Sequence, residues 1–367
     1  MKADDVRFMR RAVALARKGL GRTSPNPPVG AVVVARGRAV GEGWHRRAGA
    51  AHAEVEALRN AGGRARGATL YVTLEPCNHH GRTPPCVDAV LAAGIRRVVY
   101  GARDPNPRVR GGGTARLRRA GVAVEPGPEP AASAELIAGF ASVMRRGRPF
   151  VTLKLAATLD GKIATTSGAS RWITGPAARQ LVHRLRNEND AVMVGAGTVL
   201  ADNPQLTCRV RGGRDPLRVI VDGRLRIPLD AAVLTKASAP GTLIATVASR
   251  GRKLKALQAR GAAVLVAPGR AGHVSLPRLL RALARRGVSS VLLEGGATLA
   301  AAALRARVVD RLMLFLAPKV IGADGLDMLG MLGVRALPSA PALRITRVDR
   351  IGDDLLVDAM IGARHAN

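Results

Sequence analysis

Aromatic residues are scarce in this sequence and make up 2% of its 367 residues. Few rings are therefore available to stack on the bases of single-stranded nucleic acids. The cores must instead be built from Val, Leu, Ile and Ala, and a hydrophobic content of 47% is ample for this. Because one core rarely serves a chain of this length, we expect two domains.

Cysteine is also scarce, with three residues in the chain. This number argues against a disulfide framework and for a reducing compartment. The sequence lacks an apolar run of about 18 residues, and its first residues follow a polar amphipathic pattern rather than that of a signal peptide. We therefore expect a cytoplasmic protein with no membrane partner.

Acidic residues are outnumbered, with 26 against 58 basic residues and a formal net charge of +32. Such a charge could attract nucleic acid. The basic residues are spread along the chain rather than gathered in blocks, and an anionic small molecule would fit equally well because Arg binds phosphate through two parallel hydrogen bonds. We expect a phosphorylated small-molecule substrate and no nucleic-acid partner.

The residues that carry chemistry lie between His52 and Cys86. His52 and Glu54 stand at the start of one expected helix, and Cys77 follows Pro76 after an expected strand. Eight residues then separate Cys77 from Cys86. One imidazole and two thiolates can hold Zn²⁺ and leave its fourth position open for water, as in catalytic zinc sites. Bound zinc lowers the pKa of its water to about 7. His-x-Glu followed by Pro-Cys is the zinc deaminase signature, in which the Glu moves protons and is not a ligand.

The motif has two other interpretations. A lone His-x-Glu can occur by chance, and a lone Cys is usually a small buried hydrophobic residue. A structural zinc would be closed by a fourth protein ligand, which the motif does not offer. Because two of the three cysteines fall in one short segment, the pattern favours a catalytic zinc.

The hydrophobic pattern predicts an α/β fold with helices on both faces of each sheet. A Pro-rich segment at 125–130 and a helix at 131–145 precede the expected domain boundary, which gives domains 1–148 and 149–367. In the first domain we expect a helix near residues 4–20, strands at 30–35, 39–43, 69–74, 97–100 and 122–125, and helices at 52–61, 84–91 and 114–120. In the second we expect strands at 150–157, 191–195, 217–222, 242–247, 263–267 and 290–294, helices at 177–186, 276–286 and 297–304, and antiparallel edge strands at 311–316 and 355–361.

The second half carries weaker motifs. Gly295-Gly296 between a strand and a helix is either a phosphate-binding turn or merely a tight turn. The dinucleotide-binding fingerprint Gly-x-Gly-x-x-Gly is absent. Lys154 and Asp160 could be catalytic or could form a strand-end pair, and the sequence gives no preference.

These residues, in this order, resemble a bifunctional riboflavin-biosynthesis family. In that family a diaminohydroxyphosphoribosylaminopyrimidine deaminase is fused to a 5-amino-6-(5-phosphoribosylamino)uracil reductase. The eight-residue gap between Cys77 and Cys86 is the specific feature, since cytidine and tRNA-adenosine deaminases have two residues there. The matching segments are residues 25–30, 52–58, 73–77, 79–86, 104–107, 154–161, 172–174 and 198–202.

The resemblance implies a cytidine-deaminase-like three-layer domain followed by a domain similar to dihydrofolate reductase, in a homodimer or homotetramer. It implies Zn²⁺ on His52, Cys77 and Cys86, with Glu54 as the catalytic proton carrier. Zinc hydroxide would deaminate 2,5-diamino-6-(5-phosphoribosylamino)pyrimidin-4-one, and NADPH would then reduce the ribosyl group to ribityl phosphate. The implied substrate contacts are Asn26, His79, Arg82, Ser170, Arg186, Leu206, Arg209 and Glu294. The implied NADPH contacts are Ala156, Trp172, Thr198, Asp202, Gly223, Gly296, Ala297, Thr298, Leu299, Ala300, Ala301 and Ala302.

Two departures from the family pattern stand out. Asn78 replaces a Ser beside a zinc ligand, and Gly223 replaces a Ser that often contacts the cofactor. Cys208 lies within the substrate-lining segment, where we expect a small buried filler. Two rival functions remain: a nucleic-acid deaminase with a basic binding platform, and a non-catalytic zinc module on a basic scaffold.

Overall fold

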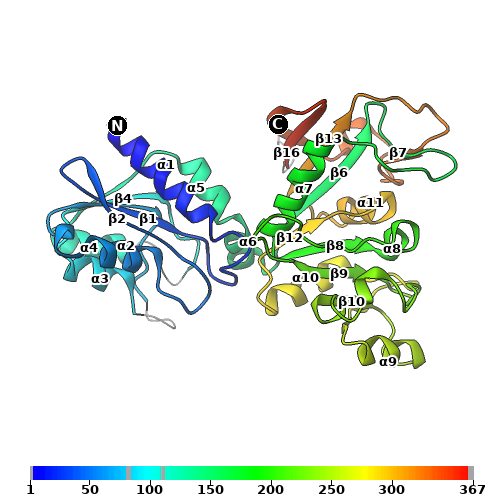
Figure 1. The fold of residues 1–367 in the computed structure, drawn as a ribbon, viewed down its shortest axis with the longest axis horizontal. Helices are drawn as coiled ribbons and strands as arrows, with labels where there is room; N and C mark the ends of the chain where they lie inside the picture. Colours follow the sequence, from blue (N-terminus) through cyan, green and yellow to red (C-terminus); the bar gives the residue numbers. More distant parts are fainter. Residues whose placement is uncertain (1–2, 80–83, 108, 110–111, 363–367) are drawn as a thin grey trace. The chain divides into compact units, whose positions relative to one another are not determined.

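The chain consists of two compact units, Met1–Gly147 and Arg148–Asn367. A computed structural model describes residues 3–79, 84–107, 109 and 112–362 (Figure 1). The division between the units falls one residue before the expected boundary at 148. Each unit has its own sheet and its own hydrophobic core, and each is described by itself.

The described part of the first unit is built on a five-stranded sheet. In spatial order its strands are β2 (Arg38–Trp44), β1 (Gly30–Ala35), β3 (Thr69–Leu74), β4 (Arg97–Ala102) and β5 (Ala123–Pro126). β1 runs antiparallel to both neighbours, whereas β3, β4 and β5 are parallel. The carboxyl ends of the parallel strands therefore meet at one edge of the sheet, where ligands of open α/β sheets usually bind.

Helices cover both faces of this sheet because its strands are apolar on both sides. Val32, Val34 and Tyr71 face α1 (Ala3–Arg17), beside which α5 (Pro130–Leu136) lies in Figure 1. The alternate strand residues face α2 (Ala53–Ala61), α3 (Cys86–Ala92) and α4 (Gly112–Arg119). The remaining elements are the short helix η1 (Gly62–Ala65) and α6 (Ala138–Arg146). This is the three-layer arrangement expected from the sequence.

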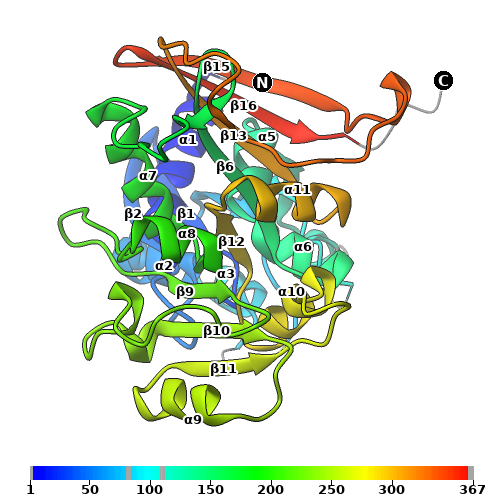
Figure 2. The ribbon, with the colours of Figure 1, turned by 90° about the vertical axis from the view of Figure 1, so that its right-hand side faces the viewer.

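The described part of the second unit contains a nine-stranded sheet, seen in Figure 2. In spatial order its strands are β11 (Ala263–Val266), β10 (Thr242–Thr246), β9 (Leu217–Val221), β8 (Ala191–Gly195), β12 (Ser290–Leu293), β6 (Phe150–Thr158), β13 (Arg311–Ala317), β16 (Asp354–Ile361) and β15 (Leu343–Ile351). Every neighbouring pair from β11 to β13 is parallel, and β16 and β15 are antiparallel to their neighbours. Two short strands, β7 (Lys162–Ala164) and β14 (Leu326–Asp327), pair separately.

Apolar helix faces cover both sides of the nine-stranded sheet. One side packs against α10 (Leu276–Arg285) and α11 (Ala297–Arg305). The other side packs against α7 (Pro176–Glu188), α8 (Ala196–Asp202) and α9 (Arg252–Ala259). The short helices η2 (Ala232–Leu234), η3 (Ala239–Gly241) and η4 (Leu337–Ser339) lie in connections. No helix of the described ranges is both long and apolar enough to cross a membrane.

Several details differ from the sequence expectations. The helix expected at 131–145 is divided into α5 and α6 at Ile137, which has non-helical backbone angles. The helices α8 and α9 were not among the helices expected in the second domain. The edge strand β15 was not predicted, because most of its residues are exposed and it lacks an alternating apolar pattern.

Candidate active sites

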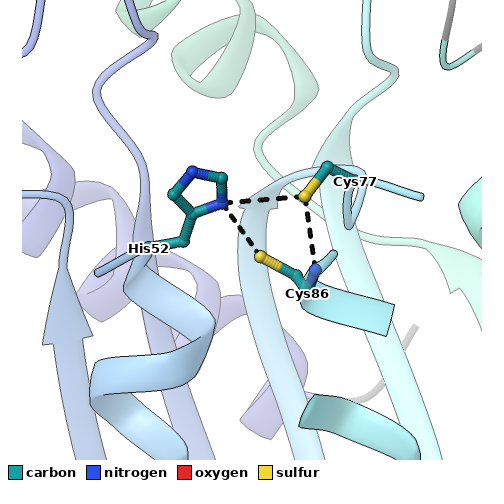
Figure 3. A group of neighbouring side chains, drawn as sticks. All are labelled: His52, Cys77 and Cys86. Carbon is teal, nitrogen blue, oxygen red and sulfur yellow. Dashed lines mark hydrogen bonds between the residues drawn. The ribbon is translucent and has the colours of Figure 1, made fainter. Parts of the chain in front are cut away.

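Three separate elements bring His52, Cys77 and Cys86 together. His52 is the N-cap of α2, Cys77 follows the end of β3, and Cys86 is the first residue of α3. The His52 Nδ1 atom lies 3.0 Å from Cys86 Sγ and 3.6 Å from Cys77 Sγ (Figure 3). All three candidate ligand atoms lie within 4.8 Å of one another. One imidazole nitrogen and two sulfurs form a donor set that suits Zn²⁺.

Close packing of α2 against β2 fixes the position of His52. A Cβ atom on Gly41 would lie 2.2 Å from the Ala57 carbonyl oxygen, and one on Gly43 would lie 2.5 Å from that of Ala53. Only glycine allows the backbones to approach so closely. The helix therefore starts at a fixed place beside the carboxyl end of β3.

The Cys77 loop is held by a buried carboxylate. Glu75 is 3% exposed and accepts hydrogen bonds from the Thr114 hydroxyl at 2.9 Å and from the Asp104 backbone N–H at 3.4 Å. Gly113 is needed beside this loop, because a Cβ atom there would lie 2.0 Å from the Pro76 carbonyl oxygen. Glu75 therefore anchors the loop and is not one of the three clustered ligands.

The proton-binding properties of the cluster suit metal coordination. The pKa of the Cys77 thiol falls to about 4, chiefly because Cys86 donates a hydrogen bond to it. That hydrogen bond and burial raise the pKa of Cys86, and the hydrogen bond with Cys77 raises the pKa of His52. Cys86 N–H also donates to Cys77 Sγ at 3.3 Å. One thiolate is thus already favoured, and a cation would favour the second.

Glu54 lies beside this cluster in a buried position. Its side chain is in the first turn of α2, and the residue is 4% exposed. Burial raises its pKa, and it interacts electrostatically with His52 and Cys77. A carboxyl group whose proton affinity is raised in this way is suited to accepting and returning a proton.

His45, which no sequence motif marks, lies beside the cluster in the structure. It is 2% exposed, and its ring centroid lies 5.3 Å from that of His52. Its Nδ1 atom contacts the Ala51 carbonyl oxygen at 3.0 Å, while Asn26 Nδ2 lies 3.2 Å from its Nε2. A carbonyl can only accept, so Nδ1 carries the proton and the neutral ring accepts from Asn26. Burial lowers the pKa of His45 and favours this neutral form.

Of the other predicted deaminase contacts, His79 lies two residues beyond Cys77. It is partly buried, and its Nδ1 atom has no hydrogen-bond partner among the described residues. Arg82 lies outside the described residues.

In the second unit, the structure brings Thr198 and Gly296 together at the carboxyl ends of β8 and β12. Gly296 N–H donates to the Thr198 hydroxyl at 3.3 Å, and Gly296 is the N-cap of α11 without a side-chain cap. The first intrahelical hydrogen bond runs from Ala300 N–H to the Gly296 carbonyl oxygen. The N–H groups of Ala297, Thr298 and Leu299 come before Ala300 and have no intrahelical acceptor, so they are available to an anionic ligand such as a phosphate.

Arg186 and Glu294 form a two-pronged ion pair at the same edge of the sheet. Arg186 Nε and Nη2 donate to the two Glu294 oxygens at 2.7 and 2.8 Å, and Nη1 donates to the Thr207 carbonyl at 3.0 Å. Burial works to raise the pKa of Glu294, but Arg186 outweighs it and the net shift is downward. Burial lowers the pKa of Lys154, which interacts electrostatically with both residues. Three ionisable groups that lie far apart in sequence thus share one site.

Asp160 does not belong to this group. Its carboxylate accepts backbone N–H groups of Ile321 and Gly322, the latter at 2.7 Å. It therefore anchors a loop, and Lys154 is the member of the expected pair that faces the ionisable cluster.

The other predicted reductase residues lie around the same edge. The exposed Trp172 ring is stacked by Arg179 at 4.5 Å, and Arg171 donates to the Asp202 carbonyl at 2.6 Å. Ala156 and Ser170 are partly buried, Leu206 is buried with a positive φ of 56°, and Gly223 follows β9. Arg209 donates to Gln205 at 3.3 Å, and half-buried Cys208 contacts the His183 carbonyl.

Comparison with known proteins agrees with both halves. Residues 149–357 match the RibD C-terminal domain family, and residues 2–102 match the cytidine and deoxycytidylate deaminase zinc-binding region. The riboflavin biosynthesis protein RibD of Actinobacillus pleuropneumoniae is 43% identical over 358 residues, which cover 97% of this chain and 95% of that protein.

Two solved structures are similar over the whole chain. RibD of Acinetobacter baumannii is 38% identical with a TM-score of 0.87, covering 98% of this chain and 99% of that one. A diaminohydroxyphosphoribosylaminopyrimidine deaminase/5-amino-6-(5-phosphoribosylamino)uracil reductase from Thermotoga maritima is 40% identical, with the same TM-score and coverage.

The zinc-binding deaminase region and the RibD-type reductase domain imply Zn²⁺ and NADPH as cofactors. The nitrogen–sulfur donor cluster suits the first, and the uncapped N-terminus of α11 suits the phosphates of the second. The chain belongs to the RibD family of riboflavin-biosynthesis proteins and carries both a deaminase and a reductase domain.

Proposed function

We propose that the chain deaminates 2,5-diamino-6-(5-phosphoribosylamino)pyrimidin-4-one in its first unit and reduces the ribosyl group of the product in its second. The observation that carries this proposal is the buried cluster of His52, Cys77 and Cys86 with Glu54 beside it, in a chain that also carries a reductase domain. The name of the Thermotoga maritima relative supports the choice of substrate.

In the deaminase unit, His52 would hold zinc through Nδ1, and Cys77 and Cys86 through their sulfurs. Zinc in such a site makes a water molecule nucleophilic at neutral pH. Glu54 would take a proton from the attacking water and deliver it to the amino group, which leaves as ammonia. Its burial supports this role, because a raised pKa lets one carboxyl group serve as base and then as acid.

Substrate contacts in this unit would come from three residues. Asn26 would hold the pyrimidine ring, and its orientation is supported by its contact with His45. His79 and Arg82 would meet the ribose phosphate, and the unpartnered Nδ1 atom of His79 supports a ligand contact there.

In the reductase unit, NADPH when bound supplies a hydride for C1′ of the ribose. The free amides at the start of α11 and the Thr198 hydroxyl would bind its phosphates, with Ala156, Trp172, Asp202 and Gly223 as further contacts. Arg186, Glu294, Ser170, Leu206 and Arg209 would contact the substrate. Arg186 also donates a hydrogen bond to the Thr207 carbonyl, which holds the Arg186–Glu294 pair in place and supports its use as a rigid binding element.

We also propose that the protein is a cytoplasmic homo-oligomer, a dimer or tetramer. Edge strand β15 exposes Leu343, Ile345 and Val348 by 48%, 59% and 57%. Their partners on β16 are spaced two residues apart along that strand, so the three side chains lie on one face of the sheet. A second copy would bury this face.

Light scattering after gel filtration tests the oligomeric state. It should give a dimer or tetramer for the natural protein, and Val348→Glu should shift the protein toward monomer. A natural protein that runs as a monomer would contradict the proposal.

The deaminase assignment is tested by Glu54→Gln, with Glu56→Gln on the same helix as a matched control. Mass spectrometry should show that Glu54→Gln releases no ammonia but still reduces the deaminated substrate with NADPH. Glu56→Gln should retain both reactions, since Glu56 is paired with Arg46 at 3.5 Å on the surface side. Normal deamination by Glu54→Gln would contradict the role of Glu54.

A further inference from the structure

A group of arginines follows the carboxyl ends of β9, β10 and β11. These strands are adjacent and parallel, so their carboxyl ends lie along one edge of the sheet (Figure 2). Arg224 comes two residues after Asp222 at the end of β9, Arg250 follows β10 and Arg270 follows β11. All three side chains are exposed, and none has an acidic partner within the described residues.

Hydrogen bonds hold the three connecting segments against one another. Val247 N–H and the Thr246 hydroxyl both donate to the Gly223 carbonyl, the latter at 3.0 Å. Arg224 Nη2 donates to the Ala271 carbonyl at 3.2 Å. The three arginines therefore stand on neighbouring, mutually braced turns.

The packing at Gly223 decides which atoms can reach a ligand here. A Cβ atom on Gly223 would lie 2.0 Å from the Gly272 carbonyl oxygen. The segment that carries Arg270 thus fills the space that a side chain at position 223 would need. Side-chain contacts to a ligand at the carboxyl end of β9 must therefore come from the neighbouring arginines, because position 223 has no room for a side chain.

No carboxylate competes for these cations. The carboxylate next to Arg224 in sequence is Asp222, which is 1% exposed and accepts the Ile227 backbone N–H at 2.9 Å. Asp230 lies further along the same segment and forms no ion pair with the three arginines in the described structure. By contrast, three basic residues near the reacting end already have partners: Arg186 binds Glu294, Arg171 binds the Asp202 carbonyl and Lys319 binds the Trp172 carbonyl. The ends of β9, β10 and β11 therefore carry three exposed arginines with no ion-pair partner in the described part of the chain.

The separation along the sheet suits the two ends of an adenosine nucleotide. β12, which leads into α11, is separated from β9 by the single strand β8. Neighbouring strands lie about 4.8 Å apart, so the ends of β9 and β10 lie roughly 10–15 Å along the edge from the N-terminus of α11. A cofactor whose pyrophosphate rests on α11 could lay its adenosine across β8 and place the ribose beside β9 and β10.

We infer that Arg224 and Arg250, with Arg270 beside them, form the subsite for the 2′-phosphate of NADPH and set the preference for NADPH over NADH. This inference rests on the proposed reductase function. Arginine suits the role because its planar guanidinium binds phosphate oxygens through two hydrogen bonds. NADH carries a hydroxyl at that position and gains nothing from the three charges.

The test is cofactor binding measured by titration calorimetry, without turnover. The double variant Arg224→Ala/Arg250→Ala should bind NADPH, and the fragment adenosine 2′,5′-bisphosphate, at least about tenfold more weakly, because each contact to a charged group is lost. Its affinity for NADH should stay within about twofold. The control Arg281→Ala changes an exposed arginine on α10 and should alter none of these affinities.

Two results would overturn the inference: equal losses of NADPH and NADH affinity in a variant with an unchanged circular dichroism spectrum, or no loss of either. Arg250→Lys, which keeps the charge, should lose only part of the NADPH affinity. A natural protein that binds neither cofactor would instead refute the proposed reductase function, so the two failures are distinguishable.

Discussion

Replacing Arg186 by Met should destabilise the second unit strongly. The Arg186 and Glu294 side chains are 14% and 10% exposed, and two hydrogen bonds of 2.7 and 2.8 Å join them. Removing one partner of a buried pair leaves an uncompensated charge and typically costs about 3–5 kcal/mol. Because Lys154 still places positive charge near Glu294, we expect the lower end, about 3 kcal/mol.

The loss should depend on pH in a defined direction. In the natural protein the pKa of Glu294 is lowered, so the pair contributes fully above the unfolded value of about 4.3 and is lost as pH falls through the folded pKa. Without Arg186, burial raises the pKa of Glu294. Stability of the variant then falls as pH rises through that raised pKa. The difference between the two proteins should therefore be smaller near about pH 5.5 than near about pH 8.

Native-state hydrogen exchange at the amides of α7 and β12 measures the free energy of opening within the second unit. A local measurement is needed because a two-unit chain need not unfold in one step. Arg350→Met is the control, since its pair with Asp353 is 75% and 90% exposed and should matter by less than about 1 kcal/mol. The double variant Arg186→Met/Glu294→Met should recover most of the loss. An Arg186→Met effect as small as that of the control, or one that grows toward low pH, would refute this reasoning.

Three further outcomes are expected. Cys77→Ser should abolish stoichiometric zinc in the purified protein, measured by plasma mass spectrometry, whereas Cys208→Ser should retain it; equal zinc in both would exclude Cys77 as a ligand. Gly30→Ala should lower the melting temperature markedly, because its Cβ would lie 2.1 Å from the Ala12 carbonyl oxygen, whereas Gly63→Ala, with open space around it, should change stability by less than about 0.5 kcal/mol. Removing zinc with a chelator should abolish ammonia release but leave the reduction of deaminated substrate intact, and loss of both reactions would mean that the units are not independent.

Much of the fold followed from the sequence because its strands and helices are locally consistent. β3, buried along its length, and the helices that carry His52 and Cys86 have strong periodic patterns, and the zinc cluster could be predicted from its spacing. β15 could not, because its residues are exposed and its pairing with β16 depends on tertiary structure.

The side-chain environment of the sites was less predictable. Nothing in the sequence marks His45, whose position depends on the end of β2 meeting the turn that carries Asn26. The Arg186–Glu294 pair spans 108 residues. The family resemblance indicated both residues as substrate contacts, but no local pattern marks this arginine, among 58 basic residues, as buried and paired with Glu294. Likewise, the packing of Gly272 on Gly223 becomes visible only once the strand ends are assembled.

The most direct test of the proposed function is mass-resolved turnover of the phosphoribosylated diaminopyrimidinone by the purified chain, with and without NADPH. We predict ammonia release without NADPH, followed by a gain of two hydrogens only when NADPH is added. An unchanged substrate in the zinc-loaded protein under both conditions would contradict the assignment of both reactions to this chain.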